Sequence, residues 1–439
     1  MKKWTLFFVM ISWGSSALAQ DTTRLSLLFL GDVMQHDSQI AAAWQPEFGT
    51  YDYTSCFQHI EPILRSADLT IGNLEVTLAG PPYKGYPQFS APDQLALALQ
   101  KAGVDVLVTA NNHSMDRGRQ GVERTIDLLD SIHLLHTGTF KDSTERAQRY
   151  PLVLQANGFK LALLNYTYGT NGIPVSKPNI VNLIDTVQIK RDIGLARQLG
   201  ADVLITFFHW GSEYQSQPNA WQERVSKLCF REGVALVIGA HPHVLQPMAW
   251  YRDRDQLVAY SLGNFVSGQR VRYRDGGAML QVVLSKVTMP DSTSRVSIQD
   301  AGYQLQYVYR DARKKYYVLP VSDFENDTVL VREAAAREQL KIFASDSRAL
   351  FDRYNLNIGE VKLAPDSAYY YVVSDSLVGV SPELLKFFDI KFDSARLEWR
   401  SAPFFDRETA KSAVDQLRQL APPQTFRLVF FSRGRRQEY

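Results

Sequence analysis

The chain has 439 residues, 45% of them hydrophobic and 21% charged, which is typical of a soluble globular protein and too long for one ordinary core. Its formal net charge of +2 gives no electrostatic reason to expect nucleic acid as a partner. We therefore expect one large domain with a smaller one appended, and no nucleic-acid function.

The N-terminal segment has the features of a signal peptide. Two lysines follow the first methionine, and residues 4–13 form an apolar stretch that is too short to span a bilayer. Small residues precede a cleavage site expected between Ala19 and Gln20. The alternative, an uncleaved anchor, fits this short stretch less well. We expect residues 1–19 to be removed and the mature protein to be periplasmic or extracellular.

Short apolar runs alternate with amphipathic stretches of helical length between residues 25 and 287. Asn157-Gly158 separates two apolar runs and predicts a β-hairpin over 152–166. The pattern predicts strands at 25–30, 69–71, 104–109, 202–208, 234–238 and 257–261, and helices at 57–65, 92–102 and 121–132. Buried strands alternating with helices predict an α/β fold with helices on both faces of the sheet layer.

The pattern changes after about residue 290. Strands are expected over 303–319 and a helical stretch over 328–355. From residue 369 a small α+β unit is expected, with a helix over 407–420 and a strand over 426–431. We therefore divide the mature chain into a first domain at 20–290 and a C-terminal α+β region at 291–439.

The chain has two cysteines, Cys56 and Cys229. Export would permit a disulfide, and two buried free thiols are an equal alternative. Neither cysteine lies in a cluster with metal-ligand spacing, so the sequence excludes a cysteine-based zinc site.

Residues that can bind a metal follow the carboxyl ends of the expected strands. In open α/β sheets these ends form the ligand-binding edge, so the side chains should converge there. The residues are Asp32, Glu75, Asn112 with His113, His209, and His241 with His243. Carboxylates and imidazoles without thiolates suit Mn, Fe or Zn, and one or two ions are expected. His113 is also a candidate acid or base.

Local sequence supports this convergence. Gly31 would let the chain turn sharply and present the Asp32 carboxylate to a cation. Pro242 fixes its own φ between two histidines, and in an extended segment both imidazoles would point the same way.

The remaining histidines are less informative. His59, His133 and His136 have no partner motif, so we interpret them as structural residues. His36 lies four residues after Asp32 and could approach the same site.

The candidate residues lie in six ordered motifs that resemble the CapA family of capsule (poly-γ-glutamate) synthesis proteins. The resemblance covers roughly residues 25–287, and a seventh stretch, Lys84-Gly85-Tyr86-Pro87, is similar to the same family. The six motifs are Gly31-Asp32-Val33-Met34, Gly72-Asn73-Leu74-Glu75, Ala110-Asn111-Asn112-His113, His209-Trp210-Gly211, Gly239-Ala240-His241-Pro242-His243 and Ser261-Leu262-Gly263-Asn264-Phe265.

That family in turn resembles calcineurin-like metallophosphoesterases. The resemblance implies a four-layer α/β/β/α sandwich for residues 20–290. It implies His113 as a catalytic histidine oriented by Asp116, and metal ligands at Asp32, Glu75, Asn112, His209, His241 and His243. Substrate contacts are implied at Lys84, Glu213, Tyr214 and Asn264.

Two departures from the phosphoesterase pattern affect the expected metal site. Met34 stands where those enzymes carry a histidine, and a thioether is a poor ligand for hard divalent ions. Glu75 stands where they carry a bridging aspartate. One metal position is therefore expected to be weak, completed by His36, or empty.

Two functions are consistent with this sequence. The first is an exported metal-dependent hydrolase or transferase that acts on a phosphoester or an anionic polymer such as poly-γ-glutamate. The second is a non-catalytic accessory that binds such a polymer within a membrane capsule-synthesis complex. The pair His113 and Asp116 favours the enzyme, whereas Met34 favours the accessory. Arg270, Arg272 and Arg274 could guide an anionic substrate, but we prefer to interpret their alternation as an exposed strand face.

Overall fold

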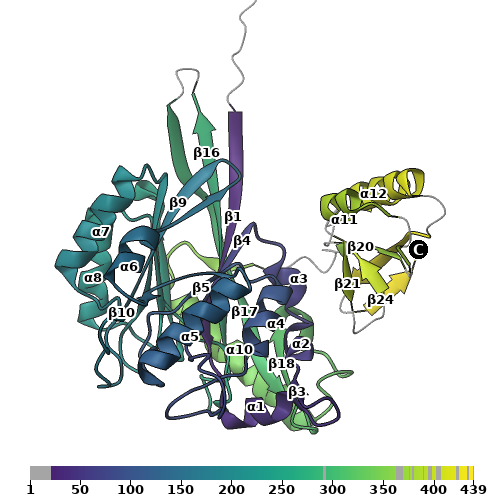
Figure 1. Ribbon diagram of the computed structural model, residues 1–439, viewed down its shortest axis with the longest axis horizontal. Coiled ribbons are helices and arrows are strands. Elements are labelled where there is room, and N and C mark those ends of the chain that lie inside the picture. The colour runs from purple at the N-terminus through teal and green to yellow at the C-terminus, as the bar shows by residue number, and fades with distance from the viewer. Residues whose placement is uncertain are drawn as a thin grey trace, which may run out of the picture.

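The protein is described by a computed structural model covering residues 21–289, 293–361, 369–374, 376–377, 380–388, 390–393, 398–401, 407–421, 425–432 and 435–438. Two β-sheets lie face to face, and helices cover both outer faces (Figure 1). The expected α/β/β/α sandwich is therefore confirmed. The expected signal peptide, residues 1–19, lies outside the described residues.

The first sheet contains both parallel and antiparallel strands. Its order is β18-β17-β16-β1-β4-β5-β6, with β15 beside β1 and β19 beside β17. The strands are β1 Asp21–Val33, β4 Leu69–Leu74, β5 Val106–Val108, β6 Leu135–Thr137, β15 Asn264–Val266, β16 Gly276–Thr288, β17 Ser294–Arg310, β18 Tyr316–Pro320 and β19 Gly359–Glu360.

The second sheet has the order β13-β14-β12-β11-β9-β8. Its hairpin turns at Asn157-Gly158, and both residues have positive φ (46° and 75°), as a type I′ turn requires. The strands are β8 Leu152–Ala156, β9 Phe159–Thr167, β11 Val203–His209, β12 Leu236–Ala240, β13 Leu245–Tyr251 and β14 Gln256–Leu262. The predicted hairpin is confirmed.

Alternation along β1 explains its continuous apolar sequence. Leu27 and Phe29 point into the core between the sheets, whereas Leu28 and Leu30 point into the core beneath the helices. All four are at most 2% exposed. Each such side chain contributes about 1.5–3 kcal/mol to folding. A strand buried on both faces therefore has no polar side to mark it in the sequence.

Different helices cover the two outer faces. Helices α2 to α5 pack on the first sheet, and α7 and α8 pack on the second (Figure 1). The helices of the sandwich are α1 Asp37–Ala43, α2 Thr54–Phe57, α3 Glu61–Leu64, α4 Gln94–Ala102, α5 Gly118–Ser131, α6 Ser143–Arg149, α7 Thr186–Gln198, α8 Ala220–Arg231, α9 Val321–Phe324 and α10 Ala334–Tyr354.

Helix ends follow local capping chemistry. The side chains of Asp185 and Asn219 accept hydrogen bonds from backbone N–H groups in the first turns of α7 and α8. Pro62 lies in the first turn of α3. Because proline lacks an N–H group and its ring clashes with the preceding turn, the single helix predicted over 57–65 is replaced by α2 and α3.

The first sheet continues past residue 290, where we expected the first domain to end. Strand β17 pairs with β16 along its length and then with β18. Phe343 and Phe351 of α10 pack into the core between the sheets, against Tyr307 and Tyr303 respectively. Residues 294–361 thus belong to the sandwich, and the expected boundary is corrected accordingly.

The chain from residue 369 onward forms a separate antiparallel sheet with two helices. The strand order is β21-β22-β20-β23-β24. The elements are β20 Tyr369–Ser374, α11 Pro382–Phe387, β21 Lys391–Asp393, β22 Glu398–Arg400, α12 Arg407–Leu420, β23 Arg427–Ser432 and β24 Arg435–Glu438. The helix predicted over 407–420 and the strand predicted over 426–431 are confirmed. Within the described residues, no helix is both long and apolar enough to cross a bilayer.

Both cysteines are buried free thiols. Cys56 belongs to α2 and packs in the core between the helices and the first sheet. Cys229 belongs to α8 and packs in the core between the helices and the second sheet. Burial raises the pKa of each thiol to about 12. Of the two alternatives, the structure has free thiols.

Candidate metal centre

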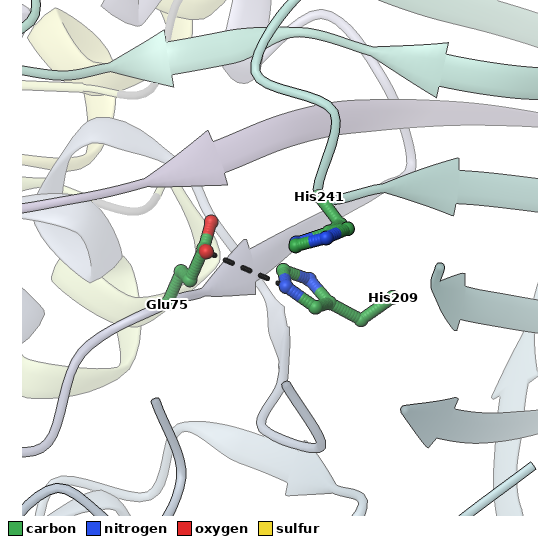
Figure 2. Close-up of side chains that lie close together, drawn as sticks. All are labelled: Glu75, His209 and His241. Atoms are coloured by element: carbon green, nitrogen blue, oxygen red, sulfur yellow. Dashed lines mark ion pairs between the residues drawn. The ribbon is translucent and has the colours of Figure 1, made fainter. Parts of the chain in front are cut away.

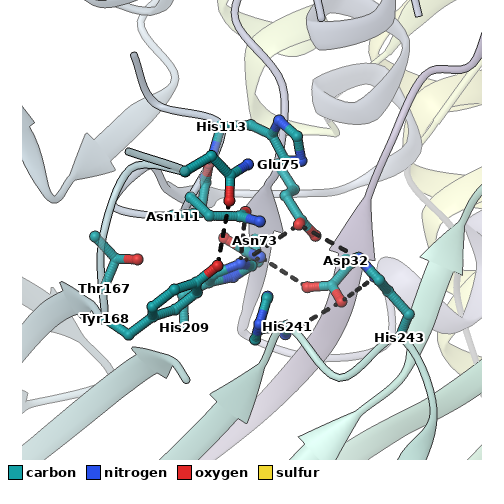
Figure 3. Close-up of polar contacts among 12 residues, drawn as sticks. Asp32, Asn73, Glu75, Asn111, His113, Thr167, Tyr168, His209, His241 and His243 are labelled. Carbon is teal, nitrogen blue, oxygen red and sulfur yellow. Dashed lines mark hydrogen bonds and ion pairs between the residues drawn. The ribbon is translucent and has the colours of Figure 1, made fainter. Parts of the chain in front are cut away.

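The six predicted metal ligands meet at strand ends of the two sheets. Figure 3 labels all of them except Asn112, which contacts His209. Asp32, Glu75 and Asn112 come from the ends of β1, β4 and β5 in the first sheet, and the three histidines come from the second. His209 ends β11, and the adjacent parallel strand β12 ends at Ala240, immediately before His241. Both sheets therefore contribute to the site, whereas the sequence predicted one edge of a single layer.

Two groups of side chains could each hold a cation. The first is Glu75, His209 and His241 (Figure 2), and the second is Asp32, Glu75 and His243. Within each group one ligand atom per residue lies within 4.8 Å of the others. The first group has a neighbour in Asn112, whose Oδ1 is 2.9 Å from His209 Nε2. Glu75 belongs to both groups and is placed to bridge two ions.

The electrostatics of these groups reflect close packing of ionisable side chains away from water. Burial raises the pKa of the Glu75 carboxyl well above its usual range, and the neighbouring Asp32 raises it further. Burial also lowers the pKa of His209 and His241, and neighbouring imidazoles add to that effect. The imidazoles are thus neutral, the form that binds metal.

The residues fit a divalent cation. Both carboxylate oxygens of Glu75 are buried and accept no hydrogen bond from the described residues, and His241 Nδ1 is likewise without a partner. Leaving a buried polar atom unpaired costs about 1–3 kcal/mol, and more for a charged group. A bound cation would satisfy these atoms. Carboxylate, amide and imidazole ligands suit Mn, Fe or Zn.

The His241-Pro242-His243 turn presents its imidazoles by an unexpected backbone conformation. We predicted an extended segment, but His241 has φ 100° and His243 has φ 57°. Left-handed backbone is unfavourable for residues with a Cβ, and each such residue costs of order 1–3 kcal/mol. Strain of this kind concentrates at functional sites, where surrounding structure enforces it. Both imidazoles lie in candidate ligand groups, as predicted, but a left-handed backbone places them there and not the extended segment that we expected.

Gly31 is required for close packing. It lies within β1, and a Cβ at this position would be 1.9 Å from the carbonyl oxygen of Gly263. The backbone N–H of Asp32 donates to that same oxygen at 2.9 Å. The sharp turn that we expected at Gly31 is therefore not present. Because Gly31 has no side chain, β1 can approach the backbone at Gly263. The resulting hydrogen bond to the Gly263 carbonyl oxygen fixes the backbone of Asp32.

Asn73 orients two ligands and was not predicted. Its Nδ2 donates to Asp32 Oδ1 at 2.8 Å and lies 3.1 Å from His209 Nδ1. Such partners fix the position of metal ligands. Strand alternation could have identified it, because Asn73 lies two residues before Glu75 and so shares its face.

His113 is held by a carboxylate. Its Nδ1 lies 2.7 Å from Asp116 Oδ2, and both side chains are buried. The same oxygen accepts the backbone N–H of Phe89 at 2.7 Å, and the Phe89 ring meets His113 edge-on at 4.6 Å. These contacts fix the imidazole and leave Nε2 for exchange with a substrate. Phe89 is a second residue that sequence reasoning did not assign.

Met34 and His36 do not complete the second ligand group. Met34 is 2% exposed and packs in the apolar core on the helix side of the first sheet. His36 belongs to neither ligand group. Its Nδ1 accepts the backbone N–H of Gly268 at 3.1 Å, and its ring lies edge-on to Phe89 at 5.4 Å. Of the three alternatives for this metal position, completion by His36 is not supported.

The four residues predicted to contact substrate lie at different distances from the candidate metal centre. Asn264 Oδ1 is 3.1 Å from His243 Nδ1, so Asn264 positions a ligand. The Tyr214 ring is 6.0 Å from the His243 ring, and the charge of the exposed Glu213 helps raise the pKa of Glu75. Lys84 is exposed on a loop, where its backbone pairs with Ser90, and within the described chain its side chain forms no hydrogen bond or ion pair with a ligand residue.

Tyr168 also adjoins the site, although its sequence gave no signal. Its ring centroid is 4.6 Å from that of His241 and 6.3 Å from that of His209, and the side chain is 41% exposed. The ring therefore covers one side of the histidine group. By contrast, His59, His133 and His136 belong to neither ligand group, as expected.

Two facing sheets with buried carboxylates and imidazoles at their strand ends define an α/β/β/α sandwich protein with a candidate metal centre. Residues 26–269 match the family described as bacterial capsule synthesis protein PGA_cap. The match covers more than half of the chain, so the protein belongs to this family. The resemblance to CapA proteins is thereby confirmed.

Two curated relatives are named as capsule or PGA biosynthesis proteins. The chain is 30% identical over 280 residues to the capsule biosynthesis protein CapA of Bacillus anthracis, covering 60% of this chain and 64% of that protein. It is also 30% identical over 274 residues to the PGA biosynthesis protein CapA of Bacillus subtilis, covering 60% and 68%. The match thus spans less than two thirds of the B. anthracis relative.

Solved structures with a similar fold include two enzymes. They are the NAD nucleotidase of Haemophilus influenzae (13% identity, 78% of this chain and 65% of that chain, TM-score 0.41) and the calcineurin-like phosphoesterase YfkN of Bacillus subtilis (13%, 74% and 98%, TM-score 0.41).

Proposed function

We propose that this protein acts in the synthesis or export of an anionic polymer of the poly-γ-glutamate type, as a metal-dependent hydrolase or transferase. Two observations carry the proposal: Glu75 belongs to both candidate ligand groups, and the carboxylate-held His113 lies near enough for its charge to help lower the pKa values of His209 and His241. The names of the CapA relatives supply the polymer. A site that only bound metal would have no use for an oriented imidazole that can exchange a proton.

Each side chain has a role in this proposal. Glu75, His209, His241 and Asn112 would hold one divalent ion, and Asp32, Glu75 and His243 would hold a second. When bound, such ions polarise a carbonyl or phosphoryl oxygen and lower the pKa of water. Asp116 holds the Nδ1 side of His113, so the Nε2 atom delivers a proton to the leaving nitrogen or oxygen.

A non-catalytic accessory role is the second candidate. Met34 turns into the core, which leaves the group of Asp32, Glu75 and His243 with three ligands. A relative from Mycobacterium tuberculosis, 25% identical over 226 residues, is described as a probable polyglutamine synthesis accessory protein. In this role the metal centre would bind polymer carboxylates for a membrane capsule-synthesis complex. For either role we propose that the protein acts outside the cytoplasm. This proposal rests on residues 1–19, where two lysines precede a short apolar stretch.

The two roles differ in whether substrate bonds break. The full chain, loaded with Mn, Fe or Zn, should shorten poly-γ-glutamate or release phosphate from a phosphoester, and a chelator should stop the reaction. The measurements are polymer length by size-exclusion chromatography and colorimetric phosphate release. Metal-dependent polymer binding without any cleavage would contradict the enzyme and support the accessory.

A further inference from the structure

Three arginines follow the last motif, and the structure separates their roles. Residues 268–275 form a loop between β15 and β16, so the exposed strand face that we expected there is not present. Arg270 donates to the Val308 carbonyl oxygen. Arg272 makes a bidentate pair with Asp346 at 2.7 and 2.8 Å. These two guanidinium groups are therefore used to hold the loop.

Arg274 has a different environment. Its guanidinium carbon lies 3.3 Å from the centroid of the Tyr214 ring. Within the described part of the chain no carboxylate forms an ion pair with it, and this includes the neighbouring Glu213. A planar guanidinium stacked on an aromatic face keeps its N–H edge available for hydrogen bonds. Arg274 is thus a fixed cation that forms no ion pair with the described residues, although the charge of Glu213 also acts on the Tyr214 side chain.

Both partners of the stacked pair are tied to the candidate metal centre. The backbone N–H of Tyr214 donates to the Pro242 carbonyl at 2.8 Å, between the two histidines of the turn. The Arg274 carbonyl accepts from Asn264 Nδ2 at 2.7 Å, and Asn264 Oδ1 lies 3.1 Å from His243 Nδ1. Tyr214 also has a left-handed φ of 66°, a strained conformation for a tyrosine. The surrounding fold therefore enforces the placement of this pair.

We propose that Arg274, held on the ring of Tyr214, binds an anionic group of the substrate beside the His243 side of the metal centre. The group is a carboxylate or a phosphate, because either accepts two parallel N–H bonds from a guanidinium. This inference rests on the proposed function, since it concerns the substrate of the same site. Arg274 would thus be a substrate-binding residue distinct from the metal ligands and from His113.

Binding measurements on the metal-loaded full chain test this assignment. The probes are a short γ-glutamate oligomer and inorganic phosphate, titrated by calorimetry into the wild-type protein, Arg274→Gln, Arg274→Lys and Arg272→Gln. We expect Arg274→Gln to weaken binding of one probe about 10- to 100-fold, as for the loss of a charge-assisted pair. Arg274→Lys should recover part of that loss. The affected probe shows whether the anion is a carboxylate or a phosphate.

Arg272→Gln is the matched control, because it removes the same charge from the same loop. Equal losses in Arg272→Gln and Arg274→Gln would show that the position or the overall charge of the loop, and not the Arg274 guanidinium itself, determines binding, and would overturn the assignment. Unchanged binding in Arg274→Gln, with wild-type binding intact, would also overturn it while leaving the proposed function in place. If the metal-loaded wild type bound neither probe, both proposals would fail. Thermal unfolding and metal content show whether each variant is folded and loaded.

Discussion

Glutamine at position 75 is expected to make the metal-free protein more stable at neutral pH while abolishing its stabilisation by metal. Glu75 is buried beside Asp32, and both its carboxylate oxygens lack a hydrogen-bond partner among the described residues. Glutamine has nearly the same shape and no charge. The substitution therefore removes the charge repulsion between residue 75 and Asp32. It also removes the carboxylate that belongs to both ligand groups.

The pH dependence of this effect follows from the raised pKa of the Glu75 carboxyl. Between the pKa of an unfolded glutamate, about 4.5, and the higher pKa of the folded state, the unfolded chain has already released a proton that the folded chain retains. Wild-type stability is therefore lost as pH rises through this window, by about 1.4 kcal/mol for each unit of pKa shift. Glutamine does not titrate, so its advantage grows with pH.

Thermal unfolding from pH 4.5 to 8, with and without Mn²⁺, measures both effects. Metal should stabilise the wild type by about 2.7 kcal/mol when free ion is 100 times Kd, and Glu75→Gln hardly at all. The exposed Glu47→Gln provides the control and should behave as the wild type. A Glu75→Gln protein that is less stable without metal, or equally stabilised by it, would contradict the bridging role.

Replacing His113 with alanine should lower kcat about 10²- to 10⁴-fold, the usual contribution of a general acid or base. Metal content should stay unchanged, because His113 belongs to neither ligand group. Asp116→Asn should have a smaller effect of the same sign, since Asp116 acts by orienting the imidazole. The measurement is the rate of hydrolysis beside elemental analysis of each variant.

His133→Asn is the control for this prediction. His133 is exposed, and its left-handed φ of 56° is tolerated by asparagine. Its activity should match the wild type. An active His113→Ala protein would remove the proton-transfer role and favour the accessory function.

Much of the site could be predicted because strand ends are visible in the sequence. A run such as residues 25–30 is apolar on both faces, and the residues after it are then placed at a sheet edge. Asp32, Glu75 and His209 were identified in this way without any contact information. The Asn157-Gly158 turn was equally clear, because its backbone preference is local.

Features that depend on distant parts of the chain could not be predicted. The left-handed backbone of His241 and His243 is imposed by surrounding structure and opposes the preference of histidine itself. The stacking of Arg274 on Tyr214 joins residues that lie 60 positions apart in the sequence. Likewise, α10 completes the core between the sheets through Phe343 and Phe351, so its packing decides the domain boundary.

The central claim is that Glu75 and the strand-end histidines form a metal centre. Elemental mass spectrometry of the purified protein, offered Mn, Fe and Zn without chelator, tests it most directly, beside the His241→Ala, His243→Ala double variant. We predict one or two ions per wild-type chain and their loss from a variant that still folds. A wild-type protein that holds no ion under these conditions would contradict the account.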